Sequence, residues 1–416
     1  MNTGLRRGRL RGMRALRPAA GAVMAAALAG QAGGADVESV YDPDVHTTGP
    51  GFNIALSVGT GDTLTIYTGT SSAAPYYQLN GGSQYDGEKV TNPNNTVQMA
   101  VFCFNSIHID NPDAINVTGD LGLVLGSRGN FMFANASLSV GGGDGGNGSP
   151  GPGGPGAEGG ARLSYGSNPP GGTAGNGGLG NRVNGVGHGA GKGYEGSGTR
   201  GGRGAGAGYG GNGDTGEGFT NGGTPHYGVM YGDALLKDLY GGSGGGAGYF
   251  SVNRGGGGGG GAVEFVALGR LDFNGSVLAN GGNGYKTTGG SGPNQGAGGG
   301  GSGGGVLLTG NTVTIGPTAA INARGGTGWS ATVGEGAGGR VAIYSAKAWT
   351  KAQADWIQTD GDASNDGLDD GNYEVNGLTF NNGATVDVRG GSNNSGVGSF
   401  HLVSVPPPAG TLIGIR

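Results

Sequence analysis

Residues Val263–Gly282 read VEFVALGRLDFNGSVLANGG, and a similar stretch, VLLTGNTVTIGPTAAINARGG, follows at Val306–Gly326. A third copy begins at Val341 (VAIYS) and resumes at Leu378–Gly391 (LTFNNGATVDVRGG). Each copy has three short runs in which apolar and polar residues alternate, and each closes on two glycines. Alternation with a period of two is typical of β-strands, so the repeat predicts three strands per unit.

This repeat also predicts how the units are arranged. If each run alternates, six apolar residues of the first unit share one side: Val263, Phe265, Leu271, Phe273, Val277 and Ala279. A unit of about 20 residues with three short strands matches one coil of a parallel β-helix. Stacked coils would bury a thin apolar column. We therefore predict an all-β fold, a parallel β-helix (β-solenoid) with long glycine-rich loops.

An antiparallel sandwich is the alternative, because Asn274-Gly275 is a strong hairpin signal. The equivalent position of the next unit is Gly316-Pro317, which does not make the same turn. The strands are also shorter than the 5–6 residues typical of ordinary sheets, and the insertions between them vary in length. Both features favour the β-helix.

Composition divides the chain into five segments. Residues 1–35 are a predicted signal peptide, 36–140 an N-terminal β-helix segment, and 141–261 a glycine-rich insert. Residues 262–400 hold the C-terminal β-helix repeats, interrupted by an insert at 346–377, and 401–416 form a C-terminal tail. The predicted strands of the N-terminal segment are Asn53–Val58, Thr63–Tyr67, Val97–Phe104, Ser106–Ile109, Ala114–Val117, Leu121–Leu125, Phe131–Phe133 and Ser137–Val140.

Glycine supplies 108 of the 416 residues and is concentrated in residues 141–261, against roughly 7% in average proteins. Ordering a residue costs roughly 1–2 kcal/mol of backbone entropy, and glycine has no side chain to bury in return. The tract is therefore predicted to be mobile or loosely packed, or else to form polyproline-II-like helices bonded between backbones. Its one apolar island, Tyr231–Tyr240 (YGDALLKDLY), is expected to hold the tract against the core.

The N-terminus has the pattern of a secretory signal. Six arginines and no acidic residue precede Asp36, and a short apolar run at Pro18–Gly30 is followed by a cleavage site near Ala35. Cleavage would leave 17 basic and 28 acidic residues, a net charge of −11. Such a charge argues against nucleic acid as a partner. No later stretch approaches 18 apolar residues, so no transmembrane span is expected in the mature chain.

Three glycine-rich stretches, 231–250, 255–284 and 336–345, resemble the repeats of large exported bacterial surface proteins. The stretch 106–143 is similar to the coils of haemagglutinin-like adhesins. Together they cover about two thirds of the mature chain. The resemblance implies a right-handed β-helix and a secreted or cell-surface location, and it implies no reaction.

Residues 346–377 carry the predicted helix and the candidate metal site. Ala346–Gln358 (AKAWTKAQADWIQ) is expected to form one short helix with Trp349 and Trp356 on the same face. In the acidic segment that follows, Asp362, Ser364 and Asp366 have the spacing of an EF-hand-like calcium loop, with Asp370 as a further oxygen ligand. The position of the closing Glu holds Tyr373, so a solvated acidic loop without metal is the alternative.

No catalytic or cofactor-binding residues are predicted. The histidines (His46, His108, His188, His226 and His401) are scattered, without partners at zinc spacing. Asp110, Asp113 and Asp120 are candidates for an acid–base pair, although turns favour Asp for backbone reasons as well. We expect a structural or adhesive surface protein whose partner is extracellular glycan or cell-surface material. The alternatives are a carbohydrate-active β-helix enzyme of the polysaccharide lyase or glycosidase type, and a disordered glycine-rich matrix protein.

Overall fold

The structure, a computed structural model, describes the residues in fourteen ranges: 54–91, 97–146, 149–157, 186–191, 194–195, 203–215, 227–236, 238–249, 253–286, 297–328, 334–346, 378–379, 383–391 and 395–404. The predicted signal peptide, the inserted helix beyond residue 346, the acidic segment and the end of the tail lie outside these ranges. All described residues belong to the unit Asp36–Arg416.

The described residues form β-strands and no helix. In the N-terminal part these are β1 (Ala55–Val58), β2 (Thr63–Tyr67), β3 (Tyr76–Leu79), β4 (Gln84–Asp86), β5 (Glu88–Thr91), β6 (Gln98–Phe104), β7 (Ser106–Asp110), β8 (Ala114–Thr118), β9 (Gly122–Ser127) and β10 (Phe131–Ser139). The later strands are β11 (Tyr194–Glu195), β12 (Gly248–Tyr249), β13 (Asn253–Arg254), β14 (Ala262–Leu278), β15 (Gly305–Ile315), β16 (Ala320–Asn322), β17 (Arg340–Ser345), β18 (Leu378–Thr379), β19 (Thr385–Asp387) and β20 (Ser399–Ser404).

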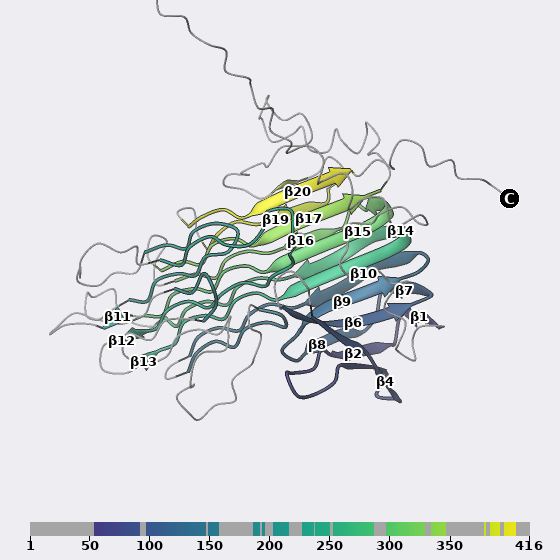
Figure 1. Ribbon diagram of the computed structural model, residues 1–416, viewed down its shortest axis with the longest axis horizontal. Helices are drawn as coiled ribbons and strands as arrows, with labels where there is room; N and C mark the ends of the chain where they lie inside the picture. Colours follow the sequence, from purple (N-terminus) through teal and green to yellow (C-terminus); the bar gives the residue numbers. More distant parts are fainter. Residues whose placement is uncertain are drawn as a thin grey trace, which may run out of the picture. The chain divides into compact units, whose positions relative to one another are not determined.

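Parallel pairs fall into three rows, whose strands lie side by side in Figure 1. The first row runs β6–β9–β14–β15–β17–β20. The second runs β1–β7–β10–β14–β15, and the third β10–β14–β16–β19. Strands β10, β14 and β15 each enter more than one row, and the register shifts in the β10–β14 pair at Ala134–Ser137 and in the β14–β15 pair at Ala267–Arg270. Such bulges bend a strand.

The described part is thus all-β, as predicted, but its sheets are mixed. In the large curled sheet, β5 pairs antiparallel with β6, and β18 with β19. A separate sheet of order β4-β3-β2-β8 combines two antiparallel pairs with the parallel pair β2–β8. The all-β prediction is confirmed, whereas a parallel β-helix running through the chain remains a prediction.

No hairpin forms at Asn274-Gly275, because β14 runs through both residues. The Asn274 side chain bonds along the row instead, where its Oδ1 accepts the backbone N–H of Thr318 at 2.9 Å and the Thr318 hydroxyl at 2.8 Å. At Gly275 a Cβ would overlap the ring of Phe133. The glycine therefore serves close packing between neighbouring strands, and the antiparallel alternative is wrong here.

The six residues predicted to share one side of the first unit are all buried in one apolar cluster. Neighbouring units add equivalent side chains, so that Phe133 stacks on Phe273 with ring centroids 5.6 Å apart and Phe131 lies 4.9 Å from Phe265. Each fully buried side chain of this size contributes roughly 1.5–3 kcal/mol. The predicted apolar column is therefore confirmed, and it joins segments far apart in the sequence.

The other side of the first row carries a second apolar cluster. Val266, Leu307 and Tyr344 of the row are buried there against Leu236 and Leu239. The Tyr344 hydroxyl also donates a hydrogen bond to the carbonyl of Leu235 at 2.5 Å. The island Tyr231–Tyr240 thus packs on the sheet, as its sequence indicates, and the first row is covered on both sides.

Glycine-rich stretches extend from the strand ends and lie alongside one another (Figure 1). Their backbone bonds repeat every third residue: the N–H groups of Gly142 and Gly145 donate to Asn280 and Asn283 at 2.8 and 2.7 Å. Those of Gly257 and Gly260 donate to Gly299 and Ser302, both at 2.9 Å. Three residues per turn is the period of the polyproline II helix. The pattern indicates polyproline-II-like segments bonded between backbones, here called the glycine array.

Backbone entropy predicts a mobile or loosely packed tract, and the described stretches of the tract differ from that expectation. A Cβ on Gly258 would overlap the carbonyl oxygen of Pro152, and one on Gly301 would overlap that of Gly258. The absence of side chains lets backbones approach within hydrogen-bonding distance on several sides. The many bonds formed, each worth about 0.5–1.5 kcal/mol net, offset much of the ordering cost.

Candidate functional site

The predicted calcium ligands Asp362, Ser364, Asp366 and Asp370 lie outside the described residues, so calcium binding remains a prediction. Within the described ranges, no three His, Cys, Asp or Glu side chains are grouped so that they could hold a metal ion. Nor does any helix there have the length and hydropathy to cross a bilayer.

The three candidate acid–base aspartates are hydrogen-bonded to neighbouring segments of the chain. Asp110 Oδ1 accepts the Asn135 side-chain amide at 2.9 Å, and Asp113 Oδ1 accepts the Gly61 backbone N–H at 3.0 Å. The backbone N–H of Asp120 donates to the carbonyl of Gly69 at 2.7 Å. These bonds connect segments that are far apart in the sequence. The structure does not bring the three carboxylates together as a metal-type cluster.

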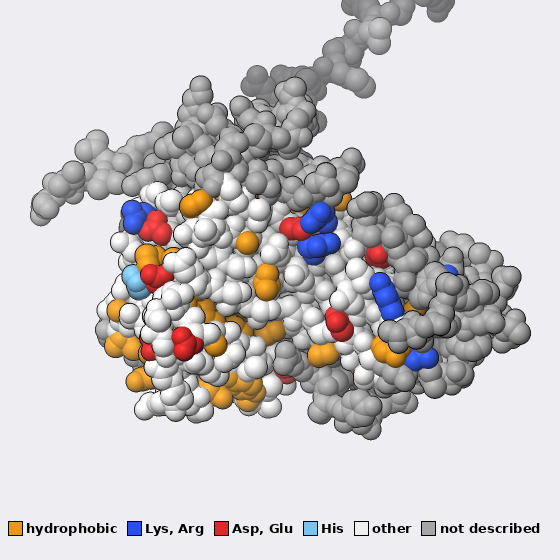
Figure 2. Space-filling view, turned by 180° about the vertical axis from the view of Figure 1, so that it is seen from behind, with side chains coloured by type: hydrophobic (Ala, Val, Ile, Leu, Met, Phe, Trp, Pro, Cys, Tyr) orange, Lys and Arg blue, Asp and Glu red, His pale blue; other side chains and the backbone are white. Residues whose placement is uncertain are grey.

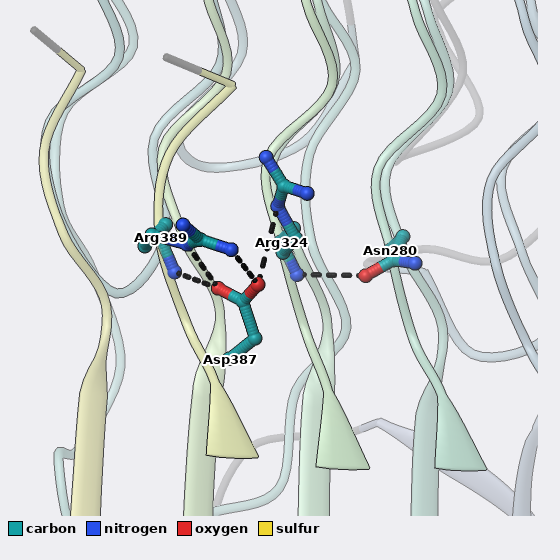
Figure 3. Close-up of polar contacts among 4 residues, drawn as sticks. All are labelled: Asn280, Arg324, Asp387 and Arg389. Carbon is teal, nitrogen blue, oxygen red and sulfur yellow. Dashed lines mark hydrogen bonds and ion pairs between the residues drawn. The ribbon is translucent and has the colours of Figure 1, made fainter. Parts of the chain in front are cut away.

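A charged cluster lies at the end of β19 (Figure 3). Arg389 binds Asp387 through Nε to Oδ1 at 2.9 Å and through Nη2 to Oδ2 at 2.5 Å, while Arg324 Nε lies 3.5 Å from Oδ2. The backbone N–H of Arg324 donates to Asn280 Oδ1 at 2.8 Å. Burial raises the pKa of Asp387, but the bonds from Arg389 and the charge of Arg324 outweigh burial and leave the pKa below its usual value. This carboxylate joins two neighbouring units, the Arg324 N–H bond to Asn280 connects a third, and the carboxylate is not poised as an acid.

The outer side of the sheet β4-β3-β2-β8 combines tyrosines with uncharged polar groups. Along β2 the residues Leu64 and Ile66 are buried, so the alternate residues of the strand face outward. Strand pairing aligns their neighbours in the other strands on the same side. We call this surface the tyrosine face; its members are Thr63, Thr65, Tyr67, Tyr76, Gln78, Gln84, Asp86, Ala114, Asn116 and Thr118.

Pairing between strands arranges the tyrosine face in rows across all four strands. One row is Thr118–Tyr67–Tyr76–Asp86, and the next is Asn116–Thr65–Gln78–Gln84. The rings of Tyr67 and Tyr76 lie side by side, with centroids 5.1 Å apart and planes tilted by 40°. An aromatic pair therefore adjoins a line of amide and hydroxyl groups.

A rigid support lies directly beneath this face. Tyr77 points inward from β3 and packs edge-on against Phe102 and Phe104, at centroid distances of 6.0 and 5.3 Å. Tyr85 stacks on Tyr77 at 5.1 Å from the inner side of β4. Burial, with the neighbouring Tyr85, raises the pKa of Tyr77 to about 12, so its phenol stays neutral. These packed rings fix the positions of β3 and β4, and with them Tyr76 and Gln78.

Few charges lie near the tyrosine face, and those few are acidic or already bound. The ammonium of Lys89 donates to the carbonyls of Thr70 and Ser71 at 3.1 and 2.8 Å. Asp86 ends the row that contains Tyr67 and Tyr76. Asp62 directly precedes Thr63 of β2, and Asp113 directly precedes Ala114 of β8. Figure 2 shows a surface that is mostly uncharged, with hydrophobic side chains gathered over the end that carries β1 to β4 in Figure 1.

The tyrosine face is not among the predicted sites, because no strand is predicted between Tyr67 and Val97. A signal was present in Asn80-Gly81, which separates YYQL at β3 from QYD at β4. Asn-Gly favours hairpins because both residues accept positive φ, and Asn80 and Gly81 have φ of 53° and 66°. That dipeptide would have indicated β3 and β4, although not the alignment of Tyr67 with Tyr76.

Comparison with protein-family models, with curated proteins and with solved structures finds no match to this chain.

Proposed function

We propose that the chain is an exported bacterial surface or extracellular protein with a structural or adhesive role and no catalytic activity. The observation that supports this most is the backbone-bonded connection between the three parallel rows and the glycine array. Gly261 N–H donates to Val140 at 2.7 Å, Gly304 N–H to Ala279 at 2.7 Å and Arg340 N–H to Gly304 at 2.9 Å. These bonds connect the residues before β14, β15 and β17 to the neighbouring units. The result is a stiff framework suited to display or adhesion.

We further infer that the three rows are faces of a right-handed parallel β-helix. The register supports this, because Val263 pairs with Leu123 on one side and Val306 on the other, and Val306 then pairs with Val341. Each unit supplies one strand to a row, as a coil does. The antiparallel strands β3, β4, β5 and β18 are then local additions to that coil stack.

Export by way of residues 1–35 can be tested by expressing the full chain in a bacterial host and fractionating the cells. The proposal predicts a chain outside the cytoplasm whose intact mass lacks residues 1–35. A full-length chain retained in the cytoplasm would contradict export. A variant with the arginines before Pro18 changed to glutamine should stay inside, because the basic n-region is part of the signal.

A carbohydrate-active enzyme is the alternative function. Such an enzyme needs two carboxyl groups about 5–10 Å apart that are free to act on a glycosidic bond. The carboxylates of Asp110 and Asp113 already accept hydrogen bonds from neighbouring segments, which disfavours these two residues. An assay for reducing ends and unsaturated products separates the alternatives. Turnover lost in Asp110→Asn would establish the enzyme and refute the structural proposal.

A further inference from the structure

We propose that the tyrosine face binds a neutral polysaccharide, an inference that rests on the adhesive role proposed above and names its ligand class. The first step is the aromatic pair. Tyr67 and Tyr76 are half-buried and their rings pack against each other, so both are held in place while each stays partly accessible. An aromatic ring offers an apolar surface to the C–H groups of a pyranose, and a tyrosine adds a hydroxyl that can bond to a sugar hydroxyl.

The second step is the polar row beside the rings. Thr65, Gln78 and Asn116 present hydroxyl and amide groups, which both donate and accept hydrogen bonds. Sugar hydroxyls also do both, so these uncharged groups match them without desolvating a charge. Four strands spaced about 4.8 Å apart give each row a length of about 14 Å. That length suits a short stretch of a polysaccharide better than a single sugar.

The charges beside the tyrosine face favour a neutral polymer over an anionic one. Asp86 ends the row that contains Tyr67 and Tyr76. Asp62 and Asp113 directly precede Thr63 and Ala114, which lie at the other end of β2 and β8. Lys89, the nearby cation, already donates to two backbone carbonyls. The whole chain carries a net charge of −5. An anionic polysaccharide would be repelled, whereas a neutral polymer meets no penalty.

The inference is tested by affinity electrophoresis of the full chain in gels containing hydroxyethylcellulose, dextran or galactomannan, with alginate as the anionic comparison. We expect at least one neutral polymer to retard the protein and alginate to leave it unaffected. Tyr67→Ala and Tyr76→Ala should each weaken binding by roughly 2- to 10-fold, the range of a single aromatic contact. Tyr67→Phe should keep most of the binding because the ring remains.

Tyr285→Ala is the control, because Tyr285 is a partly exposed tyrosine outside the sheet β4-β3-β2-β8, where it lies against Arg254. This control variant should unfold cooperatively and should be retarded as much as the unchanged protein. Gln84→Ala, on the tyrosine face, is a second and structurally mild variant that should weaken binding. Retardation by alginate alone, retardation that survives the double change at Tyr67 and Tyr76, or no retardation by any neutral polymer would overturn the inference. If the double change at Tyr67 and Tyr76 alters the oligomeric state but not polysaccharide binding, the tyrosine face serves self-association and the inference is overturned.

Reducing ends are measured in the same samples, so that the two proposals fail separately. Release of reducing ends would refute the non-catalytic role even if the tyrosine face binds. Absence of retardation without turnover would refute the binding face and leave the structural role intact.

Discussion

At the scale of single residues, glycine acts through its missing side chain. In the glycine array the backbone of one segment occupies the space where a neighbour's Cβ would stand, as at Gly258 against Pro152. Gly59 is different, since the nearest atom to an added Cβ is a carbonyl oxygen at an ordinary 3.9 Å. Composition alone cannot separate these two kinds of glycine.

Substitution by alanine should have different effects at Gly258 and Gly59. Gly258→Ala should lower the free energy of unfolding by about 1–3 kcal/mol or more, because the packed backbones must move apart. Gly59→Ala should change it by less than about 1 kcal/mol, since the alanine fits and loses less entropy on folding. Chemical denaturation of both variants measures the difference. Equal stability of the two would mean that the array is not close-packed.

Two aspartates should respond to pH with opposite sign. The folded pKa of Asp387 lies below its unfolded value, so its contribution is present above about pH 4 and is lost as pH falls through the folded pKa. Burial raises the pKa of Asp214, against the lowering effect of the Thr215 N–H. The charged form of Asp214 therefore destabilises the folded state, and this cost develops as pH rises above about 4.

Asp387→Asn should thus lower the free energy of unfolding at pH 7 by about 1 kcal/mol, a small value because its arginine partners are 43% and 32% exposed. The loss should be smaller at pH 3. Asp214→Asn should raise stability at pH 7 and keep its bond from Thr215. Denaturation at the two pH values checks both signs, and equal effects at pH 3 and pH 7 would contradict this account.

At the scale of elements, the island Tyr231–Tyr240 joins the glycine array to the first row of strands. Leu236 is buried although its φ is +55°, a conformation that costs a non-glycine residue energy. Arg340, at the start of β17, donates to the carbonyls of Tyr231 and Tyr209 at 2.8 and 3.3 Å. Its guanidinium also lies 5.4 Å from the centre of the Tyr209 ring. Packing on the sheet and these bonds hold the island in its strained conformation.

Arg340→Met should therefore loosen the island. The lost bonds from a charged donor predict a decrease of about 2 kcal/mol in the free energy of unfolding. Limited proteolysis should then cut within residues 227–249 before other described segments. Arg270→Met, at an arginine that is 60% exposed and paired with Asp272, should change stability by less than about 1 kcal/mol. Indistinguishable proteolysis of the two variants would refute the role of Arg340.

At the scale of the whole molecule, the strands and the apolar column could be predicted from periodicity. A strand that buries one side toward the core has apolar residues at every second position, and this alternation is visible in the sequence. Val263, Phe265 and Leu271 are buried as that alternation requires. The order of the glycine stretches was not predictable in the same way. Their cohesion comes from backbone bonds between distant segments, such as Gly257 with Gly299, and leaves no side-chain pattern.

The tyrosine face was missed for a different reason. Its strands β3 and β4 are short and carry few apolar residues, so alternation is weak, and only Asn80-Gly81 marked the hairpin. The alignment of Tyr67 with Tyr76 depends on strand register, which the sequence does not state. Function at such a face emerges from pairing and not from a linear motif.

The central claim is that the glycine array and the strand rows fold as one hydrogen-bonded body, and hydrogen–deuterium exchange of the full chain tests it most directly. The account predicts that the amides of Gly257, Gly260, Gly261 and residues 299–304 exchange as slowly as those of β14 and β15, because they donate to carbonyls of buried residues. Exchange of these glycine amides at the rate of an unfolded chain, with β14 and β15 still protected, would contradict it.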